Sequence, residues 1–207
     1  MRILKDGDIM ISYEEIKKIF IENNGIVGTS DLMKQGITIR HLNKLIDENK
    51  LFRIKKGVYQ WIEQDVEECV IIFKLAPEAI LCMESALYYH GYTDRVPNCF
   101  NIAVNRDSNK RKYKINYPIV KPYYVEAKYL NIGLMEGEIN GTKVRVYDKE
   151  RTICDVLRFV NKVDREIFNK ALQNYIKDDT KNIQRLIEYS KEFKVYNKMQ
   201  MWIGVWL

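Results

Sequence analysis

Basic and hydrogen-bonding side chains gather in one short stretch of this 207-residue chain. They are Thr38, Arg40, His41, Lys44, Arg53, Lys55 and Lys56. An arginine guanidinium forks onto the O6 and N7 atoms of guanine, and lysines bind phosphate oxygens as point charges. These residue types suit a surface that contacts double-stranded DNA. The plainer alternative is a solvated, basic face without a ligand.

Two short helices are predicted to position the first of these side chains. Thr29 and Ser30 are favourable N-caps for a helix that Gly36 ends. Thr38 then caps a second helix. By helical spacing, the inward-facing positions of the two helices are Leu32, Met33, Ile39, Leu42, Leu45 and Ile46. The polar and basic residues of the second helix are therefore expected to face outward.

A two-stranded ribbon is predicted after Asn49, because Phe52, Ile54, Val58 and Tyr59 alternate about the turn Lys55-Lys56-Gly57. With an earlier helix that Ser12 caps, the order is that of a winged helix-turn-helix, whose second helix enters the major groove of DNA. The predicted DNA-binding residues are Thr29, Ser30, Thr38, Arg40, His41, Lys44, Arg53, Lys55 and Lys56.

The remaining chain predicts a mixed α+β domain. Helices are expected at Val66–Ala76 and Glu78–His90, strands at Phe100–Val104 and Ile115–Val125, and helices starting at Asp148, Asp164, Asn182 and about Lys194. Pro118 and Pro122 favour an edge strand or a bulge. Asn140-Gly141 predicts a tight hairpin between Ile132–Ile139 and Thr142–Tyr147.

We therefore predict two domains, a winged helix-turn-helix over residues 1–64 and an α+β domain with a helical C-terminal end over residues 65–207. The apolar residues near the end are expected to pack on the body of the second domain. They are Tyr196, Met199, Met201, Trp202, Ile203, Val205, Trp206 and Leu207.

A second basic patch is predicted in the loop between the first two strands of that domain, at Arg106, Lys110, Arg111 and Lys112. Three interpretations remain open for it. It could be a solvated loop, a further contact to DNA phosphates, or a docking site for a partner protein or that partner's nucleic acid. The net charge of +6 is consistent with an anionic partner without requiring one.

Several classes of protein are not indicated. The four cysteines are widely spaced and lack a C-x-x-C pattern, so we predict neither a zinc site nor a disulfide framework, and no cofactor. No apolar run is long enough for a membrane span, and Met1–Asp6 lacks a signal-peptide core, so the expected location is the cytoplasm. His90, beside Gly91, is expected to be a helix-end residue that the backbone satisfies.

An enzyme is not predicted, although one nuclease-like pattern occurs. Glu126 and Lys128 follow a strand-like segment, and with an upstream carboxylate such as Asp107 they could hold Mg²⁺ and a water. Such a triplet is frequent by chance in a charged protein. The chain has no phosphate-loop, dinucleotide, zinc-protease or nucleophile-elbow motif.

Three sequence blocks resemble one known family, the AbiEi-type antitoxins of type IV toxin-antitoxin systems. They are GIVGTSDLMKQGITIRHLNKLIDENKLFRIKKGVY, the block Ser85 to Gly91 with the later Pro97, and Glu150-Arg151-Thr152 with Asp155. Together they run from about residue 12 to about residue 160. Arg151 and Asp155 have the spacing of a local ion pair on a helix.

The resemblance implies a transcriptional autorepressor and antitoxin of an abortive-infection pair. The winged helix would bind inverted repeats at its own promoter, and the C-terminal domain would counter a toxin that resembles nucleotidyltransferases, without necessarily forming a stable complex. Two other interpretations remain open, a winged-helix regulator without a toxin partner and a module that docks a protein. Salt dependence separates DNA binding from an apolar interface.

Overall fold

The computed structural model describes residues 11–206, so that Met1–Asp6 and Leu207 lie outside the described residues, as does the side chain of Val205. The chain divides into two compact units. The winged-helix unit comprises Met1–Lys74 and Lys114–Pro118, and the sheet unit comprises Leu75–Tyr113 and Ile119–Leu207. We describe each unit by itself and keep the domain boundary after residue 64 as a proposal.

Three helices of the winged-helix unit begin at well-formed caps or turns. They are α1 (Tyr13–Glu22), α2 (Thr29–Lys34) and α3 (Ile39–Asp47). The Ser12 hydroxyl accepts a hydrogen bond from the Glu15 amide, and the Glu15 carboxylate accepts one from the Ser12 amide, at 3.2 and 2.7 Å. This capping box satisfies amides that the first helical turn leaves free. The predicted caps at Ser12 and Thr38 are confirmed.

The strands of this unit form an antiparallel sheet in the order β1-β3-β2, made of β1 (Ile26–Gly28), β2 (Leu51–Lys55) and β3 (Val58–Trp61). The hairpin between β2 and β3 is the predicted ribbon, and its turn requires Gly57, whose φ is +81°. Strand β1 was not predicted, because its three residues are too short for an alternating pattern.

A core of its own supports the winged-helix unit. Phe20 of α1, Leu32 of α2 and Leu42 of α3 are fully buried and pack with Trp61 of β3. Helix α4 (Glu68–Leu75) adds a polar tie, because the Lys74 ammonium donates hydrogen bonds to the carbonyls of Asn23 and Ile26 at 2.6 and 2.8 Å. Burial lowers the pKa of Lys74.

The sheet unit is built on a mixed sheet with the strand order β6-β5-β4-β8-β7. Its strands are β4 (Ile80–Leu81), β5 (Phe100–Asn105), β6 (Val120–Val125), β7 (Leu134–Ile139) and β8 (Thr142–Tyr147). β5 and β6 are parallel, as are β4 and β8, and the other pairs are antiparallel. The predicted Asn140-Gly141 hairpin is confirmed, as is the edge position of the strand that holds Pro122.

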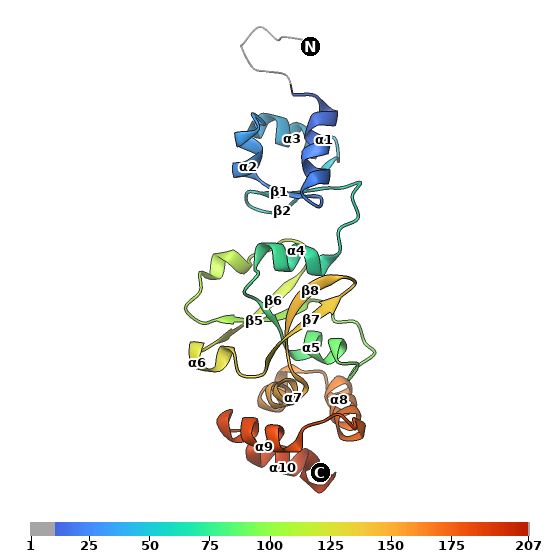
Figure 1. Cartoon of the computed structure of the whole chain (residues 1–207), viewed down its shortest axis with the longest axis vertical. Coiled ribbons are helices and arrows are strands. Elements are labelled where there is room, and N and C mark those ends of the chain that lie inside the picture. Colours follow the sequence, from blue (N-terminus) through green and yellow to red (C-terminus); the bar gives the residue numbers. More distant parts are fainter. Residues whose placement is uncertain (1–10, 207) are drawn as a thin grey trace. The chain divides into compact units, whose positions relative to one another are not determined.

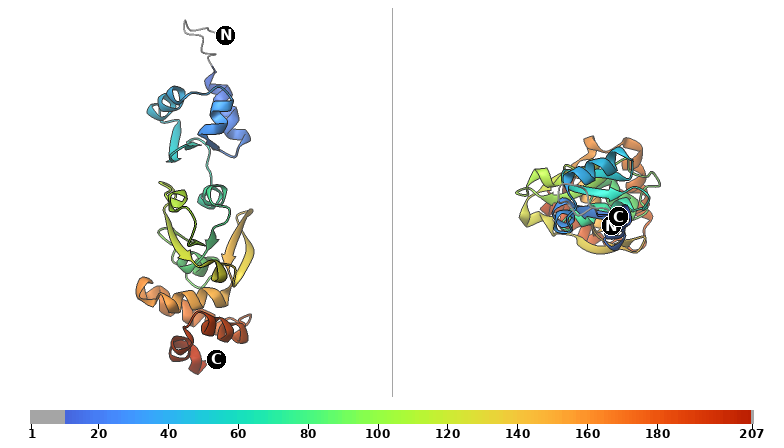
Figure 2. Two further views of the ribbon diagram at one scale, coloured as in Figure 1. Left: turned by 90° about the vertical axis from the view of Figure 1, so that its left-hand side faces the viewer. Right: turned by 90° about the horizontal axis from the view of Figure 1, so that it is seen from above.

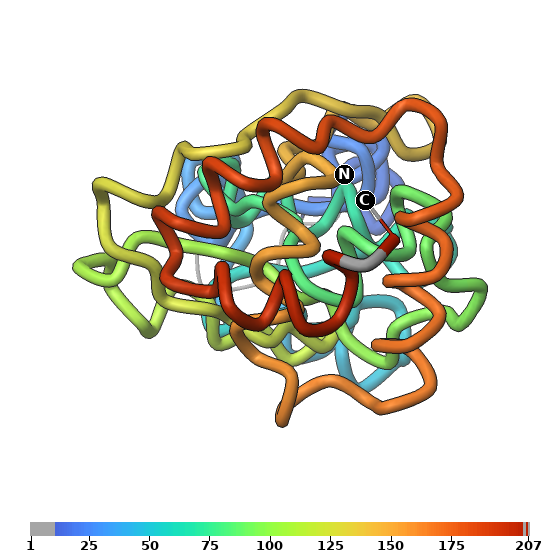
Figure 3. The backbone as a smooth tube through the Cα atoms, turned by 90° about the horizontal axis from the view of Figure 1, so that it is seen from below, coloured from blue at the N-terminus to red at the C-terminus, as the bar shows by residue number. Residues whose placement is uncertain are grey.

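Some helices of this unit pack against the sheet, and others pack on those helices (Figure 1). They are α5 (Met83–Tyr89), α6 (Ala127–Leu130), α7 (Lys149–Arg158), α8 (Arg165–Lys177), α9 (Ile183–Glu192) and α10 (Tyr196–Ile203), with short 3₁₀ turns at Lys110–Tyr113, Val160–Lys162 and Gly204–Trp206. Within this unit, α7 is sandwiched between the sheet and α9 (Figure 2), and α9 and α10 form an outer layer that Figure 3 views directly. The predicted caps Asp148, Asp164 and Asn182 are confirmed.

Two expectations for this unit were wrong. The predicted helix Glu78–His90 contains the strand β4 at Ile80–Leu81, and α5 starts only at Met83. A short, fully buried strand has no alternating pattern, so it cannot be distinguished from a buried helix by sequence. Near the C-terminus, Met199 and Ile203 are buried as expected, but Met201 and Trp206 remain 69% and 70% exposed.

The predicted fold class, a winged helix-turn-helix followed by a mixed α+β domain with a helical end, is confirmed. None of the helices within residues 11–206 combines the length and the apolar character that crossing a membrane requires.

Candidate nucleic-acid interface

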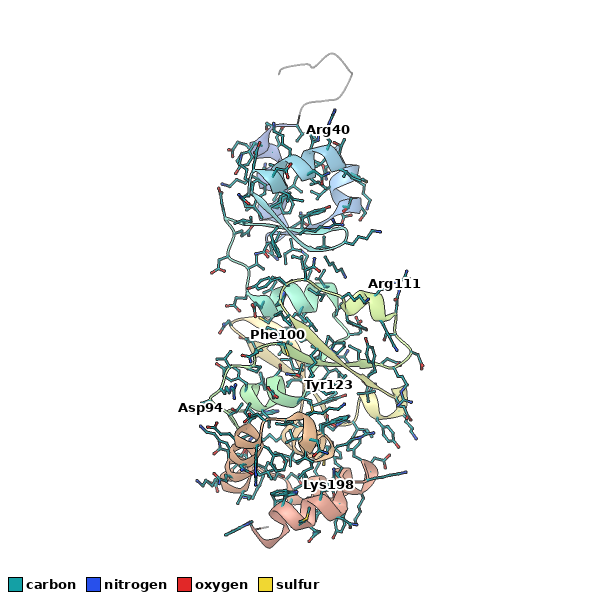
Figure 4. The ribbon with its side chains drawn as sticks, turned by 180° about the vertical axis from the view of Figure 1, so that it is seen from behind. Arg40, Asp94, Phe100, Arg111, Tyr123 and Lys198 are labelled. Carbon is teal, nitrogen blue, oxygen red and sulfur yellow. The ribbon has the colours of Figure 1, made fainter. Side chains whose placement is uncertain are left out.

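The N-terminal turn of α3 presents an exposed cation. Arg40 is exposed, and no salt bridge engages its guanidinium within residues 11–206. Figure 4 labels Arg40 at the margin of the winged-helix unit, with its side chain directed away from the core of that unit. A guanidinium in this position keeps both of its donor edges available for a bidentate contact with a base or a phosphate.

His41 has a structural task that the sequence analysis did not assign. It occupies the third position of α3, where its Nδ1 accepts a hydrogen bond from the Thr38 amide at 3.3 Å and its amide donates to the Thr38 hydroxyl at 3.4 Å. The half-buried ring thus completes the N-terminal cap of α3. Only Nε2 is left for a contact with DNA.

Ile39 is the site residue that the sequence analysis missed. Its helical spacing predicted a core position, but the side chain is 52% exposed beside Arg40, and Met33 of α2 is likewise 47% exposed. Leu42 and Leu45 are buried on the inward face of α3, and the partly buried Ile46 packs against the same core. An exposed apolar side chain at the start of a recognition helix suits contact with the methyl group of thymine.

The first helical turn of α2 differs from the prediction by one residue. Gly28 is the N-cap, so Thr29 and Ser30 are helical residues and neither acts as the cap. The Thr29 amide donates to the Gly57 carbonyl at 2.8 Å, which ties α2 to the wing turn, and the Thr29 hydroxyl is buried without a partner in the described structure. Ser30 is exposed. Of the two predicted DNA contacts, only Ser30 has an accessible hydroxyl.

The wing carries further cations at its tip. Arg53 and Lys56 are exposed, and neither forms a salt bridge within residues 11–206, while Lys55 is half-buried. On α3, Lys44 lies 3.9 Å from the Glu48 carboxylate, a weak contact between two exposed side chains. The winged-helix unit therefore brings Arg40 and Lys44 together on one helix and Arg53 with Lys56 on one hairpin.

The second basic patch lies on the sheet unit and is partly neutralised. The Lys112 ammonium and the Tyr113 hydroxyl both donate to the Glu78 carboxylate at 2.7 Å, and Arg106 pairs with Glu126 at 3.1 Å. Lys110 lies over the Tyr124 ring at 5.3 Å. Figure 4 labels Arg111 on the outside of the 3₁₀ turn. Because the two carboxylates are distant in sequence, a charge count of the loop alone could not reveal this pairing.

The nuclease-like pattern does not have the expected strand geometry. Glu126 follows β6 as the N-cap of α6, and Lys128 lies inside α6. The Glu126 carboxylate is shared by Arg106 and Lys128, whose ammonium lies 3.7 Å away. The Asp107 amide donates to the Asn105 side-chain oxygen at 2.9 Å, which forms an Asx turn after β5. Within residues 11–206, no three His, Cys, Asp or Glu side chains gather as a metal site would require.

The family-like blocks of the sheet unit have structural roles. His90 Nε2 lies 2.7 Å from the Tyr147 carbonyl, so the expectation of a satisfied helix-end histidine is confirmed. The predicted pair of Arg151 and Asp155 is also confirmed, at 3.1 Å and buried. Burial raises the pKa of the Cys82 thiol well above its usual value, which disfavours a nucleophilic thiolate.

Comparison with known proteins identifies a family model that part of the chain matches and a solved structure with a similar fold. A solved structure with a similar fold is the crystal structure of RV2827C protein from Mycobacterium tuberculosis, at 14% identity and a TM-score of 0.65 over 85% of this chain and 69% of that chain. No curated protein matches. Residues 14–60 match the family model described as transcriptional regulator, AbiEi antitoxin. The resemblance stated from the sequence is therefore confirmed over the winged helix, and the match supports a general role as an antitoxin and transcriptional regulator.

Proposed function

We propose that the protein is an autorepressor whose α3 reads inverted repeats at its own promoter and whose C-terminal domain counters a nucleotidyltransferase-like toxin. The observation that carries the DNA-binding part is the start of α3, where Arg40 is an exposed cation that no described residue engages in a salt bridge and Ile39 is an exposed apolar neighbour. Both side chains stand at the end of the helix that a winged helix-turn-helix places in the major groove.

The chemistry of the pair fits base recognition. A helix that enters the major groove brings its N-terminal residues against base edges, where Arg40 can fork onto guanine and Ile39 can cover a thymine methyl. The wing then lies beside the backbone, where Arg53 and Lys56 can neutralise phosphates. Base contacts set sequence preference, whereas phosphate contacts contribute affinity to any sequence.

The second half of the proposal rests on the family description for residues 14–60. That match lies in the winged helix, and we assign neutralisation of the toxin to the sheet unit. We assign no toxin-facing residue, and neutralisation need not require a stable complex. A winged-helix regulator without a toxin is the alternative function.

The DNA-binding part is tested by fluorescence anisotropy with a labelled duplex from upstream of the gene and a scrambled duplex of equal length. Arg40→Ala should weaken binding of the promoter duplex by about 1–3 kcal/mol, the worth of one bidentate base contact, and leave the scrambled duplex almost unchanged. Lys56→Ala should weaken both duplexes alike and lower the salt slope by about one.

A matched control is Lys18→Ala, because Lys18 is an exposed lysine of α1 whose salt-bridge partner among the described residues is Glu22, at 3.8 Å. This variant should bind both duplexes as the parent does. Equal losses on promoter and scrambled DNA for Arg40→Ala would refute base reading by α3.

The antitoxin part is tested in cells. The reading frame next to the gene is expressed alone and together with this protein, and growth is measured. Rescue that survives Arg40→Ala would place neutralisation outside the DNA-binding surface, as we expect. A harmless neighbouring product would favour the alternative of a regulator without a toxin.

A further inference from the structure

A cavity of about 350 Å³ opens in the sheet unit between β6 and α7. Its wall includes Arg106 and Glu126, which directly follow the carboxyl ends of the parallel strands β5 and β6. Ligands of open sheets with parallel strands bind outside these ends, where the loops diverge. The size lies within the range that small-molecule ligands use.

Aromatic side chains line much of this cavity. They are Tyr123, Tyr124, Tyr129 and Phe159, all half-buried. Tyr123 and Phe159 lie with their ring centroids 5.7 Å apart and their planes tilted by 60°, so they form one continuous apolar corner. Figure 4 labels Tyr123 on β6 of this unit. Such a corner suits a flat ring, because an aromatic ligand can stack on one ring and meet the edge of the other.

Positive charge exceeds negative charge around the same cavity. Its lining holds Arg106, Lys121, Arg151, Arg158 and Lys162, against Glu126 and Asp155. Both carboxylates form salt bridges with cations of the same lining, because Arg106 pairs with Glu126 and Arg151 pairs with Asp155, each at 3.1 Å. Three cations are left without a carboxylate in the described chain, and all three lie on exposed parts of the rim.

The rim cations are held near the aromatic corner. The Arg158 guanidinium and the Lys162 ammonium lie over the Phe159 ring at 5.5 and 5.1 Å, and the Lys121 ammonium lies over the Tyr123 ring at 5.6 Å. Cation–π contacts orient these groups without neutralising their charge. An anionic ligand group at the rim would thus meet several cations at once.

Two further features of the wall fit a ligand site. Arg151 is only 1% exposed, and its Nε and Nη1 donate to Asp155, Tyr129 and Ile132, which fixes a guanidinium in the cavity wall. Met83 lies in the cavity wall with a φ of +50°. Long side chains rarely adopt this conformation, and residues held in it cluster at ligand sites.

We propose that this cavity binds a nucleoside 5′-phosphate, with the base in the aromatic corner and the phosphate among Lys121, Arg158 and Lys162. The activity assigned to the winged helix does not require this site. The ligand is either a free nucleotide or the phosphorylated end of a nucleic-acid strand, which present the same chemistry. Inorganic phosphate would gain nothing from the rings, and an uncharged nucleoside would gain nothing from the three cations.

Isothermal titration calorimetry of the full chain tests the proposal with three probes, adenosine 5′-monophosphate, adenosine and inorganic phosphate. The monophosphate should bind at least about tenfold more tightly than either of the others, because only it uses both parts of the site. Its affinity should fall as salt rises. No binding of the monophosphate at millimolar concentration, or equal binding of inorganic phosphate, would overturn the proposal.

Two variants locate the site. Arg158→Gln with Lys162→Gln removes two rim charges and should weaken the monophosphate at least about tenfold, since each lost charge-assisted hydrogen bond costs about that factor. Lys143→Gln with Lys177→Gln removes the same charge from exposed positions of the sheet unit outside the cavity and should leave binding unchanged. Equal weakening in both variants would overturn the assignment of the site.

A third variant tests the aromatic part of the site without changing its charge. Tyr123→Leu retains an apolar wall but loses the ring, so it should weaken the monophosphate by a larger factor than inorganic phosphate, for which only the contact that orients Lys121 is lost. Its melting temperature is measured alongside, and a folded variant with full affinity would overturn the placement of the base. A 5′-phosphorylated oligonucleotide that competes better than the monophosphate would identify a strand end, and equal competition would identify the free nucleotide.

Discussion

Replacing Arg151 by methionine should strongly destabilise the sheet unit. The buried guanidinium donates to the Asp155 carboxylate at 3.1 Å and to the carbonyls of Tyr129 and Ile132 at 2.8 and 2.9 Å. It also lies over the Phe193 ring at 3.9 Å. Arg151 therefore joins α7 to the end of α6, to the segment after α6, and to the residue that ends α9.

The size of the effect follows from the groups that Arg151→Met would leave without a partner. Removing one partner of a buried ion pair costs about 3–5 kcal/mol, because the remaining charge stays buried without compensation. Two carbonyls would also lose donors. The thioether side chain of the variant can still cover the Phe193 ring, so we expect a loss of unfolding free energy near the middle of that range, about 4 kcal/mol.

The loss should depend on pH in a defined direction. Burial raises the pKa of Asp155, and Arg151 opposes this shift. Without Arg151 the folded-state pKa of Asp155 rises further above its unfolded value of about 3.9. A group with a raised folded pKa supports the fold below its unfolded pKa and loses that support as pH rises through the folded pKa. Arg151→Met should therefore be less harmful at pH 4 than at pH 8.

Urea unfolding followed by far-ultraviolet circular dichroism at both pH values measures this effect. The double variant Arg151→Met with Asp155→Leu removes the stranded carboxylate and should recover a large part of the lost stability. A loss below about 1 kcal/mol, or one that is equal at pH 4 and pH 8, would refute the view that this pair holds a buried charge in place.

Three further predictions concern the winged helix and the second basic patch. A fragment of residues 1–64 should still bind promoter DNA. A fragment of residues 1–78 should bind equally well but melt at a higher temperature, because Lys74 hydrogen-bonds α4 to the carbonyls of Asn23 and Ile26. A folded fragment that does not bind promoter DNA would contradict the assigned domain boundary. Ile39→Ser should weaken promoter binding several-fold without lowering thermal stability, since the side chain is 52% exposed, and a large fall in melting temperature would show a core role instead. The third variant replaces Lys110 and Arg111 by Ser and keeps Lys112, which is hydrogen-bonded to Glu78. It should lower the salt slope of DNA binding if the patch contacts phosphates, and it should abolish protection from the toxin, with repression intact, if the patch docks the toxin. If the patch is a solvated loop, neither assay should change.

Local signals made much of the fold predictable. Thr38 could be identified as a cap and Asn140-Gly141 as a hairpin turn because each depends on the backbone geometry of a few adjacent residues. Ile39 was assigned wrongly for the opposite reason. Helical spacing shows which residues share a face, but at the first turn of a helix the neighbouring elements decide whether that face is covered.

The candidate sites show the same limit more strongly. The cations of the candidate DNA-binding surface are close in sequence, so Arg40 and Lys56 could be selected by composition and spacing. The partners of the second basic patch could not, since Glu78 and Glu126 reach it from other elements. The cavity is assembled from segments between Cys82 and Lys162, and no local pattern marks such a convergence.

The third family-like block illustrates why a specific sequence pattern need not mark an active site. Glu150, Arg151 and Asp155 are all buried in α7, where Arg151 pairs with Asp155, and the other partners of Glu150 and Arg151 lie on separate elements. The Glu150 carboxylate accepts from the Asn182 amide at 2.8 Å and from the Tyr175 hydroxyl at 3.4 Å, so it joins α7 to α8 and to the start of α9. Buried charged groups at such junctions tolerate few substitutions, because each change strands a partner. A pattern of this kind marks how α7 packs in the sheet unit, and it does not show which of its residues also reach a cavity wall, as Arg151 and Asp155 do.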